Sequence, residues 1–217
     1  PPTVVDVATA EPILGEGRVT DRVDGEALGP RIVRAPRDAD QRRRLAASMG
    51  RALAAIHSID PGPIEGLTRR DPLPMVRGGL DAVGEARPAF EMALRWLDAN
   101  RPQEGPERLV HGDFRVGNLL VEGDEVTGVL DWELCHRGDP AEDLGWLCVR
   151  AWRFGGAHEV GGVADLDDLL DAYRAAGGMD IDPDVVRWWV AAGTLTWGLI
   201  CAVQARRHLD GHVRSVE

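Results

Sequence analysis

The chain has 217 residues, which is enough for one large domain or two small ones. Hydrophobic residues make up 44% and charged residues 28%, as is usual for a protein with an apolar core. The formal net charge of -11 disfavours nucleic acid and anionic membranes as partners, because both attract basic surfaces.

The cysteines and the first residues of the chain indicate the cellular compartment in which the protein works. The three cysteines, Cys135, Cys148 and Cys201, are widely spaced, so we expect neither a disulfide framework nor a zinc site. The first residues show no signal peptide pattern, and we therefore expect a cytoplasmic protein. Residues 188–205 carry no charge, but this stretch is at the lower limit for a membrane span and predicts a buried helix.

The beginning of the chain predicts two strands. Residues 3–7 and 18–23 alternate apolar and polar side chains, and residues 15–17 form a turn pattern between them. Asp24-Gly25 ends this pattern. Most of the remaining sequence predicts helices, so the fold class is α+β with a mainly helical body.

Helical spacing is clearest in the run that contains Leu45, Met49, Leu53 and Ile56, after candidate caps at Asp38 and Asp40. Residues 61–79 are rich in proline and glycine and predict a loop. Further helices are predicted around residues 90–97, 140–153, 165–176 and 182–208.

A short strand and a hairpin bring three polar side chains together. A strand at Leu109-Val110 leads to Asp113, and two strands at 118–121 and 126–130 flank a turn centred on Gly123-Asp124. This hairpin would place Asn118 and Asp131 opposite each other within a residue or two.

These groups are the ones that phosphoryl transfer requires. Magnesium prefers one or two carboxylates together with phosphate oxygens and water. A further carboxylate must orient the attacking hydroxyl and accept its proton. We assign the proton-accepting role to Asp113 and the metal-binding role to Asn118 and Asp131.

The segment as a whole resembles the aminoglycoside phosphotransferase and choline kinase group, which has a protein-kinase-like fold. The resemblance rests on His111-x-Asp113 with Asn118 five residues later, on Asp131-Trp132-Glu133, and on the run from Gly138 to Gly145. Through Phe154 it is most similar to a bacterial phosphotransferase branch related to kinase domains fused to acyl-CoA dehydrogenases. The specific match covers about residues 108–154.

The resemblance implies ATP and Mg2+ as cofactors, and it implies roles for further residues. Arg115 would contact the transferred phosphate, His111 would brace the catalytic loop, and Asp143 would hold that loop from the following helix. Asp21 and Val23 would lie in the hinge that meets the adenine ring. Residues 1–24 would then be the end of an N-terminal lobe, and residues 25–217 the helical C-terminal lobe.

One departure from this group is plain: all 25 basic residues are arginine, so the lysine that usually contacts the nucleotide phosphates is not in this chain. The chain also starts at about the last strands of the N-terminal lobe. We expect a fragment of a longer protein rather than a natural truncation, and poor ATP binding by this part alone.

The sequence therefore predicts an ATP-dependent phosphotransferase that moves the gamma-phosphate to a hydroxyl of a small molecule. An aminoglycoside acceptor would favour a dense acidic pocket, whereas a hydroxyacyl acceptor would favour a basic and apolar one. Two alternatives are a non-catalytic small-molecule-binding module and a metal-dependent hydrolase that uses His111, Asp113 and Asp131. The oligomeric state is left open.

Overall fold

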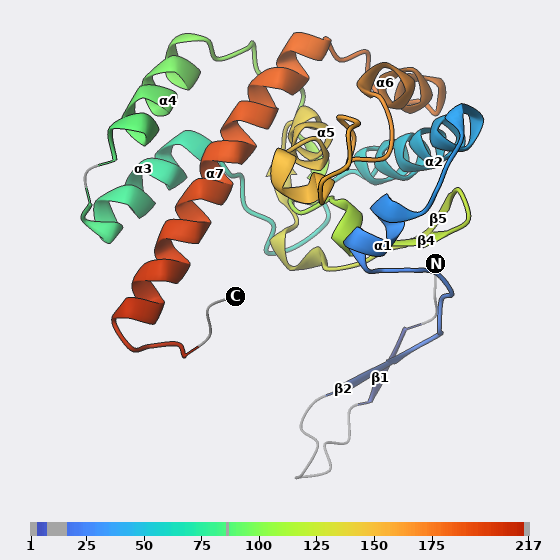
Figure 1. Ribbon diagram of the computed structural model, residues 1–217, viewed down its shortest axis with the longest axis horizontal. Helices are drawn as coiled ribbons and strands as arrows, with labels where there is room; N and C mark the ends of the chain where they lie inside the picture. Colours follow the sequence, from blue (N-terminus) through green and yellow to red (C-terminus); the bar gives the residue numbers. More distant parts are fainter. Residues whose placement is uncertain (1–3, 8–16, 86, 215–217) are drawn as a thin grey trace.

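The computed structural model describes residues 4–7, 17–85 and 87–214, and Figure 1 shows a helical body from which an N-terminal hairpin projects. The hairpin consists of β1 (Val4–Val7) and β2 (Gly17–Thr20), which pair antiparallel from Val4↔Thr20 to Val7↔Gly17. Both strands were predicted. The predicted turn between them lies outside the described residues apart from Gly17.

The segment after the hairpin joins the edge of a second hairpin, formed by β4 (Leu119–Glu122) and β5 (Glu125–Val129). The backbone of Glu26 exchanges two hydrogen bonds with that of Val121, at 2.8 and 3.0 Å. The hydroxyl of Thr127 also donates to the carbonyl of Asp24 at 2.6 Å. These bonds fix the entry to the short helix α1 (Gly29–Arg34).

The central helix α2 (Ala39–His57) begins with the predicted cap, because Asp38 and Gln41 form a reciprocal capping box. The β4–β5 hairpin packs on it through polar contacts: Ser48 accepts a hydrogen bond from the Val126 amide at 2.8 Å. Asp124, in the turn, pairs with Arg44 at 2.9 Å. On another side, α2 packs against α6 (Leu166–Ala175), which begins and ends close to its predicted bounds.

The prediction of a loop over residues 61–79 holds up to residue 71 and is wrong from residue 72 onward, where α3 (Pro72–Val83) begins. Asp71 caps this helix by accepting from the Leu73 amide, and Pro72 occupies its first turn, where proline is favoured. Gly79 allows Leu199 of a neighbouring helix to approach, since a Cβ there would lie 2.5 Å from a Leu199 methyl carbon. Tertiary packing therefore outweighs the low helix propensity of this stretch.

The single helix predicted over residues 140–153 is also wrong. The structure has α5 (Ala141–Leu147) and a separate 3₁₀ helix, Arg150–Arg153, divided by the extended residue Val149. A strand that was not predicted, β6 (His136–Gly138), precedes α5 and pairs antiparallel with β3 (Arg108–Val110). This pair anchors the start of residues 111–118, which are called the catalytic loop after the role that the resemblance implies.

Two helices complete the body, α4 (Pro88–Ala99) and α7 (Pro183–Leu209). By length and composition alone, α7 is the one described helix that is long and apolar enough to cross a membrane. It lies against α3, α4 and α5, as Figure 1 shows, and Trp188, Leu195 and Leu199 are buried in the apolar cluster there.

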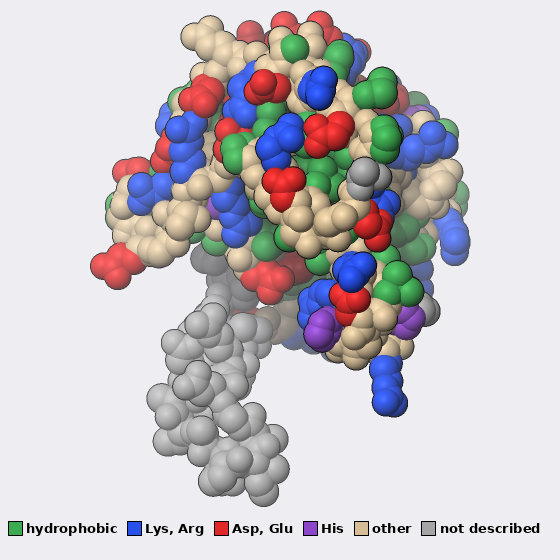
Figure 2. Space-filling model, turned by 90° about the vertical axis from the view of Figure 1, so that its left-hand side faces the viewer, with side chains coloured by type: hydrophobic (Ala, Val, Ile, Leu, Met, Phe, Trp, Pro, Cys, Tyr) green, Lys and Arg blue, Asp and Glu red, His purple; other side chains and the backbone are tan. Residues whose placement is uncertain are grey.

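The surface in Figure 2 carries arginines and carboxylates side by side, with apolar side chains between them. In α3, Arg77 pairs with Glu91 of α4 at 3.4 Å, and nearby Arg87 pairs with Glu85 at 2.6 Å. Exposed pairs of this kind contribute little stability, in general about 0–1 kcal/mol each.

The contact between α5 and α7 gives a stability prediction. A Cβ on Gly145 would lie 2.4 Å from the Cβ of Trp189, so we expect Gly145→Ala to destabilise the protein by about 1–3 kcal/mol. Gly78 of α3 has no neighbouring atom within 4 Å of such a Cβ, and Gly78→Ala should instead stabilise it by about 0.5–1 kcal/mol. Urea unfolding of both variants measures the difference, and equal effects would contradict the close packing at Gly145.

Candidate active site

Asp113 lies in the loop between β3 and the 3₁₀ helix Val116–Asn118, and only 9% of its surface is exposed. Its carboxylate accepts hydrogen bonds from three side chains. Trp146 Nε1 donates to Oδ1 at 2.6 Å, and Asn118 Nδ2 donates to Oδ2 at 2.6 Å. Arg115 Nε lies 3.1 and 3.2 Å from the two oxygens. These donors stabilise the charged carboxylate in a largely buried position.

His111 is fully buried, and both of its ring nitrogens are engaged. Nδ1 accepts a hydrogen bond from the Asp113 amide at 3.2 Å, while Nε2 lies 3.0 Å from the carbonyl of Leu130. The ring also packs against Trp132 with 4.7 Å between centroids. His111 thus ties the catalytic loop to the segment after β5.

Asp143 of α5 is hydrogen-bonded to the backbone of the same loop, as the resemblance implied. It accepts hydrogen bonds from the amides of His111 at 2.8 Å and Gly112 at 2.9 Å, and from His57 Nε2 at 3.1 Å. His57 in turn contacts the hydroxyl of Tyr173 at 2.9 Å. Burial by itself would raise the pKa of Asp143, but the hydrogen bonds and charges of its partners keep that pKa below its usual value.

Gly112 is required by the shape of the loop. Its φ of +80° is a conformation that side-chain-bearing residues rarely adopt. A Cβ would also lie 2.5 Å from the carbonyl oxygen of Leu134. The glycine therefore lets Asp113 follow directly on His111 without a clash.

Asn118 and Asp131 flank the β4–β5 hairpin: Asn118 ends the 3₁₀ helix before β4, and Asp131 follows β5 by two residues. Leu119 pairs with Val129, and the Leu130 amide donates to the Asn118 carbonyl at 2.8 Å, so Asp131 is one residue beyond the position opposite Asn118. Asp131 has a positive φ of 67°, which is strained for a residue with a side chain and is typical of functional positions.

The donor set fits a magnesium ion bound together with a nucleotide. Within the described residues, Asp131 is exposed and forms no hydrogen bond or ion pair, and no group donates to the Asn118 side-chain oxygen. One carboxylate and one amide oxygen match magnesium, which takes its remaining ligands from phosphate and water. When bound, the ion would neutralise charge on the phosphates of the nucleotide.

Three further predicted site residues have a defined place. Arg115 lies between Asp113 and the ring of Trp152, with its guanidinium carbon 4.9 Å from the ring centroid. Asp21 and Val23 lie in the irregular segment after β2, where Asp21 is exposed and Val23 is half-buried. Their contact with adenine stays a prediction.

A mainly apolar pocket of about 230 Å³ opens beside the catalytic loop. Gly112 and Trp146 form its wall toward Asp113, and α7 contributes Ala192, Thr196 and Leu199. Glu142 is its one carboxylate, and His136 contacts that carboxylate at 3.2 Å. Burial raises the pKa of Glu142, while the contact with His136 and the charge of Arg70 oppose this shift.

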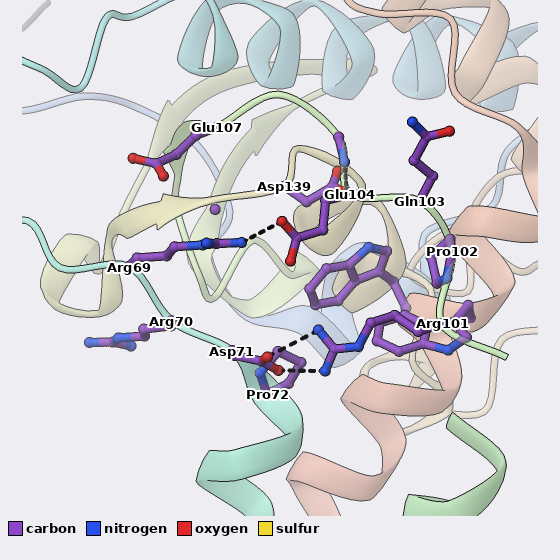
Figure 3. Close-up of a pocket in the computed structure, with 14 residues that line it drawn as sticks. Arg69, Arg70, Asp71, Pro72, Arg101, Pro102, Gln103, Glu104, Glu107 and Asp139 are labelled. Atoms are coloured by element: carbon purple, nitrogen blue, oxygen red, sulfur yellow. Dashed lines mark hydrogen bonds and ion pairs between the residues drawn. The ribbon is translucent and has the colours of Figure 1, made fainter. Parts of the chain in front are cut away.

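A second pocket of about 180 Å³ adjoins the first, and Figure 3 shows its polar lining. Arg101 reaches Asp71 with two hydrogen bonds, at 3.0 and 2.9 Å, and Arg69 pairs with Glu104 at 2.8 Å. Arg70 lines both pockets, and within the described residues its guanidinium forms no hydrogen bond or ion pair. The junction of the pockets therefore carries a positive charge, close enough to Glu142 to oppose the rise that burial causes in the pKa of that carboxyl.

Sequence reasoning did not single out Trp146 or Arg70 for the site. No spacing distinguishes Trp146 from the tryptophans that fill the core, and Arg70 is one of 25 arginines. The pairing of β3 with β6 and the packing of α5 on α7 bring them to the catalytic loop, and neither contact is visible in the sequence.

Comparisons with known proteins agree with this geometry. A model of the phosphotransferase enzyme family matches residues 2–189. Acyl-CoA dehydrogenase family member 10 of Mus musculus is 45% identical over 64 residues, which is 29% of this chain and 6% of the relative. Homoserine kinase of Methylocella silvestris is 35% identical over 103 residues, 46% of this chain and 29% of that enzyme.

Among solved structures, macrolide 2′-phosphotransferase from Brachybacterium faecium superposes with a TM-score of 0.66 at 24% identity, covering 90% of this chain and 68% of that one. The fold is thus the kinase-like phosphotransferase fold predicted from the sequence, α+β with a mainly helical body. The matched part spans less than a third of these two sequence relatives. From the family match, which covers most of its length, this chain belongs to the phosphotransferase enzyme family.

Proposed function

We propose that this chain carries the catalytic lobe of an ATP-dependent kinase that phosphorylates a hydroxyl of a small molecule, with Mg2+ held by Asn118 and Asp131. The observation that supports this most is the environment of Asp113. Its carboxylate is buried, lies 2.6 Å from the amide of Asn118 and adjoins the apolar pocket through Trp146. A base in that position can accept the proton of a bound hydroxyl.

The acceptor that fits the pockets is a hydroxylated compound with an apolar body and an anionic group, of which a hydroxyacyl compound is an example. The apolar pocket suits the body of such a molecule, and Arg70 at its junction suits the anion. In the apolar pocket a polycationic aminoglycoside would meet a single carboxylate, Glu142, which His136 already contacts. The second pocket has four carboxylates, of which Asp71 and Glu104 are paired with Arg101 and Arg69. Several relatives act on aminoglycosides or macrolides by name, but the apolar pocket does not favour a polycation.

Neither alternative function explains the site as well. In a metal-dependent hydrolase, His111 would be a ligand, but both of its nitrogens are engaged within the loop. The described residues also contain no group of three or more His, Cys, Asp or Glu side chains that could hold a metal. A non-catalytic binding module gives no reason for the strained backbone of Asp131 or for the three hydrogen-bond donors gathered on Asp113.

The experiment is an ADP-release assay on the full-length gene product with MgATP and a panel of acceptors. We expect turnover with 3-hydroxydecanoic acid or its thioester and none with kanamycin. Asp131→Asn should lower acceptor-dependent turnover by about 10²-fold or more, because it removes a charged ligand of the ion. Glu122→Gln, an exposed change at the far end of the same hairpin, is the matched control.

The outcomes separate the two parts of the proposal. Turnover with kanamycin but not with hydroxy acids would overturn the acceptor class and leave the kinase assignment standing. Unchanged turnover in Asp131→Asn, or no acceptor-dependent ADP release at all, would contradict the kinase assignment itself.

A further inference from the structure

We propose that Trp146 is a positioning residue that caps the acceptor-facing oxygen of Asp113 until a bound acceptor replaces it. This inference rests on the proposed function, since it concerns the same carboxylate. In this proposal, an acceptor that binds in the apolar pocket displaces the Trp146 indole, and Asp113 can then accept the proton of the acceptor hydroxyl.

Three N–H donors occupy the carboxylate of Asp113. Trp146 Nε1 donates to Oδ1, Asn118 Nδ2 donates to Oδ2, and the single Nε–H of Arg115 is shared between the two oxygens. A substrate hydroxyl must donate to this carboxylate to be activated, and an acceptor that approaches past Trp146 meets the indole N–H on Oδ1 first.

The two ends of the carboxylate face different surroundings. Oδ2 is on the side of Asn118, whose buried amide also donates to the Asp113 carbonyl at 3.0 Å and is therefore held twice. Oδ1 is on the side of Trp146, which lines the apolar pocket. The oxygen that an acceptor in the pocket can reach is the one that the indole covers.

Trp146 is less enclosed than Asn118. It is half-buried and forms part of a pocket wall, whereas Asn118 is buried and held by two hydrogen bonds. The Trp146 ring also contacts Trp152, at 5.3 Å between centroids, and lies against Gly193 of α7, which has no side chain. An acceptor that enters the pocket can displace the indole from Oδ1 and present its hydroxyl there.

The indole on Oδ1 should also slow the hydrolysis of ATP, in which the phosphate is transferred to water instead of to the acceptor. In that side reaction a water oxygen bonds to the gamma-phosphorus of ATP, the bond to the bridging oxygen of ADP breaks, and the water proton passes to Asp113. The products are ADP and inorganic phosphate. While Trp146 covers Oδ1, it keeps water in the pocket from that oxygen, and this hydrolysis should be slow.

Trp146→Phe keeps an aromatic ring and removes the N–H donor. With MgATP and no acceptor, we expect the full-length gene product carrying it to hydrolyse ATP roughly tenfold faster than wild type, the factor expected from loss of one charge-assisted hydrogen bond. Trp96→Phe, which changes a 53%-exposed ring on α4, should leave hydrolysis unchanged. Hydrolysis in Trp146→Phe equal to or below wild type would overturn the cap.

A spectroscopic measurement tests the contact without turnover. In protein labelled with ¹⁵N-tryptophan, the indole N–H resonance assigned by its loss in Trp146→Phe should lie downfield because its acceptor is charged. It should shift in Asp113→Asn and on addition of 3-hydroxydecanoic acid. A resonance that moves in neither case would overturn the inference, whereas absence of Asp113-dependent ATP turnover together with an intact indole response would contradict only the proposed function.

Discussion

Asp113→Asn should abolish most acceptor phosphorylation, lowering turnover by about 10²–10⁴-fold, the range that general-base catalysis contributes. The variant keeps the size of the side chain but removes the group that accepts the proton of the hydroxyl. It also puts an amide N–H among the donors Trp146, Asn118 and Arg115, where an acceptor is needed. The measurement is kcat and KM for the acceptor identified by the panel, with KM expected to change much less than kcat.

Glu122→Gln is the control for this prediction as well, since it neutralises an exposed carboxylate on the neighbouring hairpin. A circular dichroism melt of Asp113→Asn establishes that the fold persists. If a folded Asp113→Asn protein turns over within about twofold of wild type, Asp113 is not the base.

The second large effect concerns stability. Asp143 is fully buried and accepts hydrogen bonds from two backbone amides of the catalytic loop and from His57. In Asp143→Asn one oxygen that accepts a hydrogen bond is replaced by an amide N–H donor, and the negative charge that faces His57 is removed. We therefore expect the unfolding free energy to fall by about 3–5 kcal/mol. Asp171→Asn, at a side chain that is 72% exposed, should change it by less than about 0.5 kcal/mol.

The effect of Asp143 should depend on pH in a defined direction. Because its pKa is lower in the folded protein than the unfolded value of about 3.9, its stabilisation is complete above that pH and is lost as pH falls through the folded pKa. Urea unfolding at several pH values should therefore show the gap between wild type and Asp143→Asn narrowing below about pH 4. A gap that widens on acidification would contradict the assignment.

The parts of the fold that the sequence predicted are those with strong local patterns. The capped apolar run of α2 and the hairpin turn at Gly123-Asp124 determine their own structure, and both were placed correctly. The site was predicted from the same hairpin, because its register alone brings Asn118 and Asp131 near each other. Their roles in binding a metal stay predictions.

The parts that escaped prediction depend on contacts between distant segments. Helix α3 contains Pro74, Gly78 and Gly79, a composition typical of loops, and it forms because α7 packs against it. Strand β6 is only three residues long and has no partner nearby in the sequence. Trp146 joins the site through a contact over 33 positions, which no local pattern reveals.

The central claim is that the amide of Asn118 lies beside a nucleotide-bound divalent cation. Within this chain Asn100 and Asn118 are the only asparagines. In the full-length gene product labelled with ¹⁵N-asparagine, their side-chain amide signals are assigned by their loss in Asn100→Gln and Asn118→Gln. With Mn2+ and ADP in place of Mg2+ and ATP, the Asn118 signal should broaden strongly, while that of Asn100, bonded to the Trp96 carbonyl on α4, should be much less affected. Equal broadening of the two signals, or none at Asn118, would contradict the account.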